Sequence, residues 1–317
     1  MKYFLTIFFT TIIVLANGQT TLEKGKKLYE DKKFAEAQKL LKTVDDDHSD
    51  YAGAQYYLGR IAFDENKYDD AADYFEEAVD TNENVAEYQN WYGNALGNIA
   101  RDANMVRQGM LAPKMKNAWE KAVALNPQYI DPRQSLIQFY LEAPGFMGGS
   151  VDKAKEMAKE IMKVKPAEGH RQLGNIYVRE KQIPEAEKEF IAMAKADPAL
   201  TPGLANFYVN QKQFEKAFSL FEEALKKNPD DPLATYQYGR ASAVSGLRLD
   251  QGEQYLKKYL TYTPKPNEPS HAGANMRLAQ IHEKRGNKSE ARKFYETALK
   301  LDANMKEAKE GLSRVSK

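Results

Sequence analysis

Small and apolar residues recur along most of the chain in one arrangement, in which a Gly or Ala and several aromatic residues keep similar spacings. The clearest copy contains Leu58, Gly59, Phe63, Tyr68, Ala71, Phe75 and Ala78. Within each half of a copy, apolar residues lie three and four positions apart, which places them on one side of an α-helix. The pattern therefore predicts pairs of amphipathic helices that pack against each other as hairpins.

The arrangement repeats with a period of one helical hairpin. The distance from Gly25 to Gly59, and again from Gly59 to Gly93, is 34 residues. The small residues let two helices approach closely, and the aromatic residues fill the space around that contact. One hairpin cannot bury this surface alone, so neighbouring hairpins must stack. The sequence thus predicts an all-α solenoid of about eight hairpins.

These copies in register resemble the tetratricopeptide repeat (TPR), whose unit is 34 residues long. The resemblance covers nearly all of residues 20–305 and implies a right-handed α-solenoid that binds other molecules. We expect the solenoid to span 19–305, followed by a capping helix at 306–317, because a terminal repeat needs a solvated outer face. The expected units lie near 18–51, 52–85, 86–129, 130–166, 167–197, 198–231, 232–271 and 272–305.

Two units depart from the regular period. The third contains about ten extra residues near Ala100–Pro113, and the fourth has a glycine-rich connection that ends in Gly145–Ser150. Ser150 is a suitable N-cap for the helix that follows it. Together with Trp119–Val123, these features resemble a group of exported bacterial TPR proteins. That resemblance implies a fold and a compartment, but no mechanism.

The first eighteen residues have the pattern of a secretory signal peptide. Lys2 is their only charged residue, an apolar run extends over 3–16, and Gly18 is small enough to precede a cleavage site. A membrane anchor is the alternative, but the run is shorter than the roughly 20 apolar residues that a span needs. We expect cleavage after Gly18, no stable membrane span afterwards, and a periplasmic or secreted protein.

Composition limits the chemistry that is available to the chain. Lys and Arg total 46 against 45 Asp and Glu, so the formal net charge of +1 gives no argument for nucleic acid as a partner. There is no Cys, and the four His lie in different segments. A zinc site is therefore not expected, and nothing in the sequence indicates a cofactor. Asp45–Asp47 could bind a hard cation, although an isolated acidic turn is usually only solvated.

Catalytic motifs are also missing from the sequence. The glycines of Gly145–Ser150 lack the Lys-Ser/Thr ending of a phosphate-binding loop, and no lipase-type or zinc-protease motif is present. Asn287 fits a glycosylation sequon, but with Glu290 it is more typical of a capping box. We therefore predict a protein that is not an enzyme. The enzyme alternative would place a site at Ala100–Pro113 and Gly145–Ser150.

Binding residues are expected on the first helix of each hairpin, which lines the concave face of a TPR array. We take the position just after the small Gly or Ala and the position four residues earlier. These positions hold Tyr56 and Arg60, Asn90 and Asn94, Gln134 and Gln138, Arg171 and Asn175, Asn206, Tyr236 and Arg240, and Met276 and Gln280. With Tyr57 and Trp91 as possible aromatic anchors, they predict a groove for a protein or an extended peptide. An ordinary solvated face, or interhelix packing by the aromatic residues, is the alternative.

Four of these residues, Arg171, Asn175, Asn206 and Arg240, are similar to the carboxylate clamp of chaperone-binding TPR domains. The clamp's Lys positions are not matched here, and its cytosolic ligands do not suit an exported chain. A carboxylate-bearing peptide remains a suitable class of ligand for Arg and Asn side chains. A structural array that associates with itself is a further alternative, and the sequence leaves the oligomeric state open.

Overall fold

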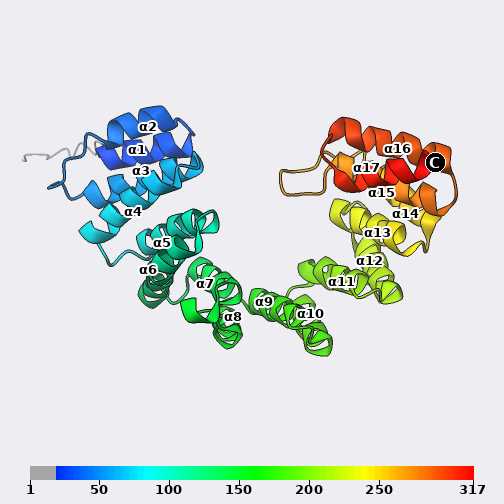
Figure 1. The fold of residues 1–317 in the computed structure, drawn as a ribbon, viewed down its shortest axis with the longest axis horizontal. Helices are drawn as coiled ribbons and strands as arrows, with labels where there is room; N and C mark the ends of the chain where they lie inside the picture. Colours follow the sequence, from blue (N-terminus) through cyan, green and yellow to red (C-terminus); the bar gives the residue numbers. More distant parts are fainter. Residues whose placement is uncertain (1–18) are drawn as a thin grey trace, which may run out of the picture. The chain divides into compact units, whose positions relative to one another are not determined.

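The computed structural model describes residues 19–317, so the predicted signal peptide lies outside the described residues. This part of the chain contains seventeen α-helices, two short 3-10 segments and no strand (Figure 1). The prediction of an all-α solenoid of helical hairpins is confirmed. The chain divides into two compact units, unit 1 ending at Ala154 and unit 2 covering Lys155–Lys317.

Unit 1 consists of successive helical hairpins. Its helices are α1 (Thr21–Glu30), α2 (Phe34–Leu41), α3 (Tyr51–Asp64), α4 (Tyr68–Thr81), α5 (Ala86–Arg101), α6 (Met105–Leu125), α7 (Asp131–Glu142) and the start of α8 (Val151–Val164). The first helices of neighbouring hairpins, such as α1 and α3, also contact each other. They form what we call the first-helix face.

Unit 2 repeats the same scheme. After the rest of α8 it contains α9 (Pro166–Arg179), α10 (Ile183–Ala196), α11 (Thr201–Asn210), α12 (Phe214–Lys227), α13 (Pro232–Ser245), α14 (Leu249–Tyr259), α15 (His271–Lys284), α16 (Lys288–Leu301) and α17 (Lys306–Val315). Its first-helix face is formed by α9, α11, α13 and α15. At the C-terminal end, α17 buries Ala308 and Val315 against the last hairpin.

The recurring glycines mark the closest contact within each hairpin. A Cβ atom on Gly59 would lie 2.6 Å from the ring of Phe75, and one on Gly93 would lie 2.6 Å from Nε1 of Trp119. Both distances are too short for a real contact, so each Gly makes room for a buried aromatic ring of the second helix. The period seen in the sequence is therefore a packing requirement.

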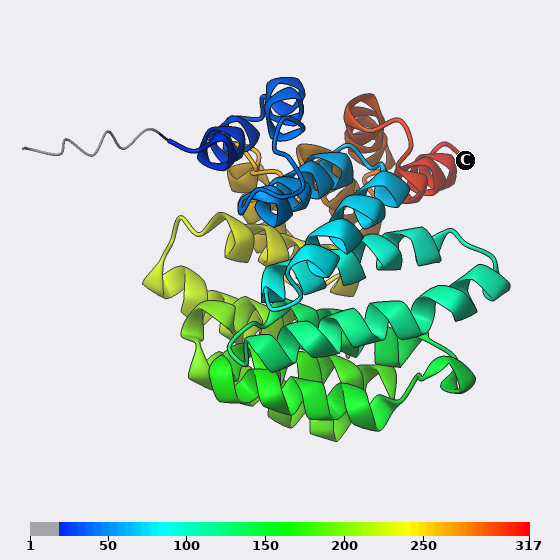
Figure 2. The same ribbon diagram turned by 90° about the vertical axis from the view of Figure 1, so that its left-hand side faces the viewer.

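The extra residues of the third hairpin lengthen its second helix. Figure 2 shows α6 in teal as a long helix, and it has 21 residues with Pro113 inside. The connection after α7 contains the 3-10 segment η1 (Gly145–Met147), followed by Gly148 with a φ of 103°. Ser150 then accepts a hydrogen bond from the backbone N–H of Lys153 at 3.4 Å, which agrees with its predicted capping role.

The predicted capping box at Asn287 is wrong. Asn287 is the N-cap residue of α16, but its side chain makes no capping hydrogen bond. Glu290 pairs instead with Lys293 of its own helix, at 2.6 Å. The ψ of 65° at Asn287 belongs to a tight turn.

None of the helices in residues 19–317 is both long and apolar enough to cross a membrane.

Candidate functional site

Arg60 is the centre of the first-helix face in unit 1. Its guanidinium donates hydrogen bonds to the hydroxyl of Tyr29 on α1, at 2.8 Å, and to that of Tyr56 on its own helix, at 2.9 Å. It also lies 3.8 Å from the ring centroid of Trp91 on α5. Arg60 therefore connects three successive hairpins, through hydrogen bonds and through a cation–π contact.

The three aromatic residues predicted for this face, Tyr56, Tyr57 and Trp91, make packing contacts with other rings. Tyr56 stacks on Tyr88 with 5.0 Å between ring centroids, and Trp91 meets Phe63 edge-to-face at 5.1 Å. Burial raises the pKa of Tyr56, and burial together with a hydrogen bond to Asp64 raises that of Tyr29 to about 12. These hydroxyls stay protonated near neutral pH, and that of Tyr29 links α1 to Arg60 and Asp64 of α3.

Asn94 has a position between three helices. Its side-chain oxygen accepts hydrogen bonds from Nε1 of Trp119 on α6, at 2.9 Å, and from the hydroxyl of Ser135 on α7, at 3.2 Å. Its Nδ2 group makes no hydrogen bond to any described residue and is not buried away from solvent. Asn94 is thus fixed through its oxygen and presents a free N–H donor.

An open pocket of about 710 Å³ lies beside Asn94. Helices α5 and α7 form its walls, and Met115 and Trp119 of α6 contribute to its floor. Both segments that depart from the repeat period contribute to it, Ala100–Pro113 through Gln108 and the η1 connection through Met147. The enzyme alternative placed its site at these segments.

The residues that line the pocket do not form a recognisable catalytic group. Arg101 and Glu142 are the ionisable residues among those that line it, and Glu142 accepts a hydrogen bond from Gln138 at 3.3 Å. No His, Lys or Asp stands beside Ser135 among the lining residues to act as a base. Within residues 19–317, no group of three or more His, Asp or Glu is arranged to hold a metal ion, and Asp45–Asp47 is no exception.

In unit 2, Arg171 is already paired within its own helix. Its Nε and Nη2 groups donate to both oxygens of Glu168, at 2.9 and 2.6 Å. Glu168 is only 8% exposed and also accepts a hydrogen bond from Gln172. Asn175, one turn after Arg171, is exposed. Of these two predicted clamp residues, Asn175 is exposed and its side chain has no hydrogen-bond partner among the described residues, whereas Arg171 is paired with Glu168 although 44% of its side chain is exposed.

Asn206 and Arg240 do lie together, as the sequence predicts. One guanidinium nitrogen of Arg240 is 3.4 Å from the side-chain oxygen of Asn206, and the other is 3.2 Å from that of Asn210. Burial, together with the positive charge of Arg277 on α15, lowers the pKa of Arg240. Arg240 on α13 and Arg277 on α15 therefore lie near enough to each other for their positive charges to interact.

Arg277 is the residue that the sequence analysis missed. Its side chain is 17% exposed, donates to Gln280 at 2.9 Å, and is 3.7 Å from its acidic partner Glu307. Its Nε atom is buried without a hydrogen-bond partner. The pair Arg240 and Arg277 thus carries more positive charge than nearby Glu307 balances. Binding of an anion would reduce the repulsion between the two guanidinium groups.

Helix geometry explains why Arg277 was missed. The predicted position lies three residues before the small residue, and at 100° per residue it points only about 60° away from it on the helix. Asn90, Tyr236 and Met276 hold this position and are 1%, 7% and 4% exposed, so they belong to the core. Tyr236 packs there against Tyr259. The residue two positions before the small residue lies about 160° away, and Trp91 and Arg277 both hold it.

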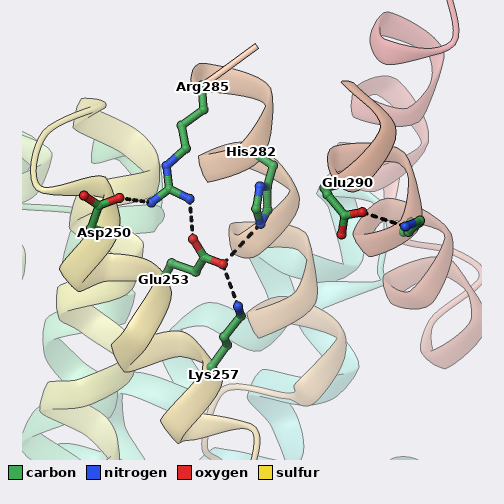
Figure 3. Close-up of polar contacts among 7 residues, drawn as sticks. Asp250, Glu253, Lys257, His282, Arg285 and Glu290 are labelled. Carbon is green, nitrogen blue, oxygen red and sulfur yellow. Dashed lines mark hydrogen bonds and ion pairs between the residues drawn. The ribbon is translucent and has the colours of Figure 1, made fainter. Parts of the chain in front are cut away.

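A second polar cluster in unit 2 connects α14 with α15 (Figure 3). The carboxylate of Glu253 accepts from Arg285 and from Lys257, at 2.7 Å for Lys257, and lies 3.4 Å from His282. Burial alone would raise the pKa of Glu253, but the hydrogen bonds from Lys257 and Arg285 lower it to about 2. A carboxylate held by several cations is a weak base, so this cluster stabilises the helix pair.

Sequence profiles described as tetratricopeptide repeats match residues 22–96, 198–241 and 272–304, so they fall in both units. No curated protein is similar enough to count as a match.

One solved structure shows the same fold, and others are similar to part of the chain. A tetratricopeptide repeat protein from Parabacteroides merdae is 13% identical with a TM-score of 0.50, and the alignment covers 94% of this chain and 98% of that one. MamA is 23% identical over 55% of this chain and 95% of its own, with a TM-score of 0.45. YrrB, described as a TPR protein with an unusual peptide-binding site, is 20% identical over 62% and 97%, with a TM-score of 0.40. The repeat matches in both units place the chain in the tetratricopeptide repeat superfamily.

Proposed function

We propose that this protein is an exported, non-catalytic scaffold that binds an extended, acidic segment of a partner protein on the first-helix face of unit 2. The observation that supports this most directly is the pair of Arg240 and Arg277. Two guanidinium groups from successive hairpins lie close enough for one to lower the pKa of the other, and the single carboxylate of Glu307 interacts with both.

The residues around this pair suit a peptide. Asn206, Asn210, Gln237 and Gln280 surround the two guanidinium groups with amide side chains. Amides can donate to and accept from a peptide backbone, while an Arg fork matches a carboxylate. The acidic residue of the ligand would be held by the Arg pair, and the flanking backbone by the amides. Asn175 would extend the same face toward α9.

Binding of labelled peptides tests the proposal. We would measure fluorescence anisotropy with short peptides rich in Glu, and with the same peptides carrying Gln instead. A lost charge-assisted hydrogen bond weakens binding by about 1.5–3 kcal/mol, or about 10- to 100-fold. We expect this loss for Arg240→Gln and Arg277→Gln, and for wild type with the Gln peptides.

Arg292→Gln is the matched control, because Arg292 lies on a second helix, is exposed and pairs with Glu296. It should bind like wild type. Equal binding of Glu and Gln peptides, or an equal loss in the control, would refute the acidic-ligand proposal. Export is tested separately, by fractionating cells that express the full chain and a chain without residues 1–18. Both forms in the same fraction would contradict it.

A further inference from the structure

The pocket in unit 1 differs from the Arg pair in both shape and chemistry. Its volume of about 710 Å³ is within the range of roughly 300–1,000 Å³ that is typical of ligand sites. Trp91 and Asn98 of α5 form one wall, Gln138 and Phe139 of α7 form the other, and Met115 lies at the floor. Its size suits several residues of a ligand and exceeds the space that one side chain fills.

Large apolar side chains are exposed on the two irregular segments that contribute residues to this pocket. Met105, Val106 and Met110 on the first turns of α6 are 66%, 75% and 69% exposed, and Phe146 in η1 is 79% exposed. The two segments meet where Gly109 faces Met147. A Cβ atom added to Gly109 would lie 3.7 Å from the methyl group of Met147. Solvating so many apolar side chains is unfavourable. Met side chains also adapt to apolar partners of different shapes.

The polar groups inside the pocket are neutral. Asn94 presents its free Nδ2 donor, and Asn98 donates its own Nδ2 to the backbone of Asn94, which leaves its oxygen as an acceptor. Gln138 adds a second amide to the wall. Amide donors and acceptors of this kind match peptide N–H and C=O groups. The charges lie at the C-terminal ends of the walls, Arg101 on α5 and Glu142 on α7.

We infer that this pocket is a second binding site, which takes an extended peptide segment of a partner protein with one large apolar side chain. The apolar side chain lies over Met115 and Trp119, and the amides of Asn94 and Asn98 bond its backbone. Charge complementarity places an acidic residue of the peptide beside Arg101 and a basic residue beside Glu142. The site is independent of the proposed Arg-pair site in unit 2.

The same residues argue against a saccharide. A sugar ring needs an exposed aromatic face to stack on, but Trp119 is only 5% exposed. One face of Trp91 is covered by Arg60, at 3.8 Å. A peptide with an apolar side chain covers the apolar floor at Met115 and bonds the amides of Asn94 and Asn98 with its backbone.

Intrinsic tryptophan fluorescence gives a direct test. The chain has two Trp, and both Trp91 and Trp119 line this pocket, so binding at the unit 2 site would not report through them directly. We would titrate blocked peptides into the millimolar range, with Phe, Met or Ser at the centre. Each would be flanked by Glu and Lys in either order. We expect saturable fluorescence changes with Phe or Met and none with Ser, and a preference for one flank order.

Gly97 supplies a matched pair of variants. A Cβ on Gly97 would lie 3.5 Å from the Trp119 ring, an ordinary contact, so Gly97→Ala should fold and bind within about twofold of wild type. Gly97→Leu extends a side chain into the pocket, and we expect binding at least about tenfold weaker. Arg240→Gln should leave the fluorescence titration unchanged while it weakens binding of acidic peptides about 10- to 100-fold, which separates the two sites.

Several results would overturn the inference. One is equal fluorescence changes for the Phe, Met and Ser peptides, and another is unchanged binding by Gly97→Leu with a wild-type circular dichroism spectrum. If Gly97→Leu does not fold, Gln138→Ala and Arg101→Glu test the same pocket from its exposed walls, and unchanged binding by both would contradict it. A saturable change with a neutral oligosaccharide, with no response to any peptide, would assign the pocket to a sugar instead.

Discussion

Two glycines on the same helix give opposite predictions for one substitution. Gly93 and Gly97 lie one turn apart on α5, and both face Trp119. A Cβ on Gly93 would lie 2.6 Å from the Trp119 Nε1 atom, whereas a Cβ on Gly97 would lie 3.5 Å from the far edge of the same ring. Gly93→Ala therefore forces the ring to move, and Gly97→Ala does not.

The magnitudes follow from these contacts. Forcing extra volume into a packed core costs about 1–3 kcal/mol. A displaced Trp119 also loses its 2.9 Å hydrogen bond to Asn94, worth about 1 kcal/mol. Ala has a higher helix propensity than Gly, and this difference offsets roughly 1 kcal/mol of the loss in stability. We expect Gly93→Ala to lower the free energy of unfolding of unit 1 by about 2 kcal/mol, and Gly97→Ala to raise it by about 0.5–1 kcal/mol.

Urea denaturation followed by tryptophan fluorescence is the suitable assay, because both Trp belong to unit 1. Circular dichroism on the same samples follows both units and shows whether the transition is shared. Stability changes of the same sign for the two variants would refute the reasoning. That result would mean that Trp119 is free to move, and that the glycine period reflects something other than the contact between helices.

Three further predictions test contacts in both units. Arg60→Leu should destabilise unit 1 by about 3 kcal/mol in urea denaturation, because two hydrogen bonds to Tyr hydroxyls and the contact with Trp91 are lost; a change below 0.5 kcal/mol would contradict the bridging role. Glu253 has a folded-state pKa of about 2, below the unfolded value of about 4.5. Its stabilisation is therefore complete above pH 4.5 and is lost as the pH falls toward 2, by at most about 3 kcal/mol and, with solvent screening, by about 1–2 kcal/mol. Acid titration of wild type and Glu253→Gln, followed by circular dichroism, should show a smaller acid loss in the variant, and identical curves would exclude the contribution. Thr20→Ala removes a side chain that caps α1 in a complete capping box and should cost about 1 kcal/mol. Asn287→Ala removes a side chain without a capping bond and should cost less than half as much by thermal denaturation; equal costs would contradict the difference between the two caps.

The fold could be predicted because its determinants are local and repeated. Gly59 and Phe75 lie sixteen positions apart within one hairpin, and the same pair of roles recurs at Gly93 and Trp119. Because the pair recurs in several hairpins, the period remains visible even where one copy has an irregular spacing. The helical hairpin, the close contact at the glycine and the stacking of hairpins all follow from this repeated short-range pattern.

The site residues could be predicted only in part, because their partners belong to other hairpins. The position of Arg60 was identified, but not that it would bond Tyr29, which lies 31 residues earlier. Arg171 was expected to be free, although Glu168, one turn before it, holds both its Nε and Nη2 groups. A carboxylate three positions before an Arg on a helix is visible in the sequence. The sequence itself therefore indicates that Arg171 is paired, and it favours Arg240 as the ligand-binding Arg.

The irregular third hairpin gives unit 1 a site that a regular repeat lacks. In a repeat array each hairpin contacts mainly its neighbours, so a change in one second helix alters one part of the first-helix face and leaves distant hairpins unchanged. Here the added turns of α6 place Gln108 on the pocket, and Met105 and Met110 of the same turns are exposed. The η1 connection contributes Met147 to the same pocket. Shortening α6 to the regular length should therefore remove the fluorescence response to apolar peptides, while acidic peptides still bind to the Arg240–Arg277 pair.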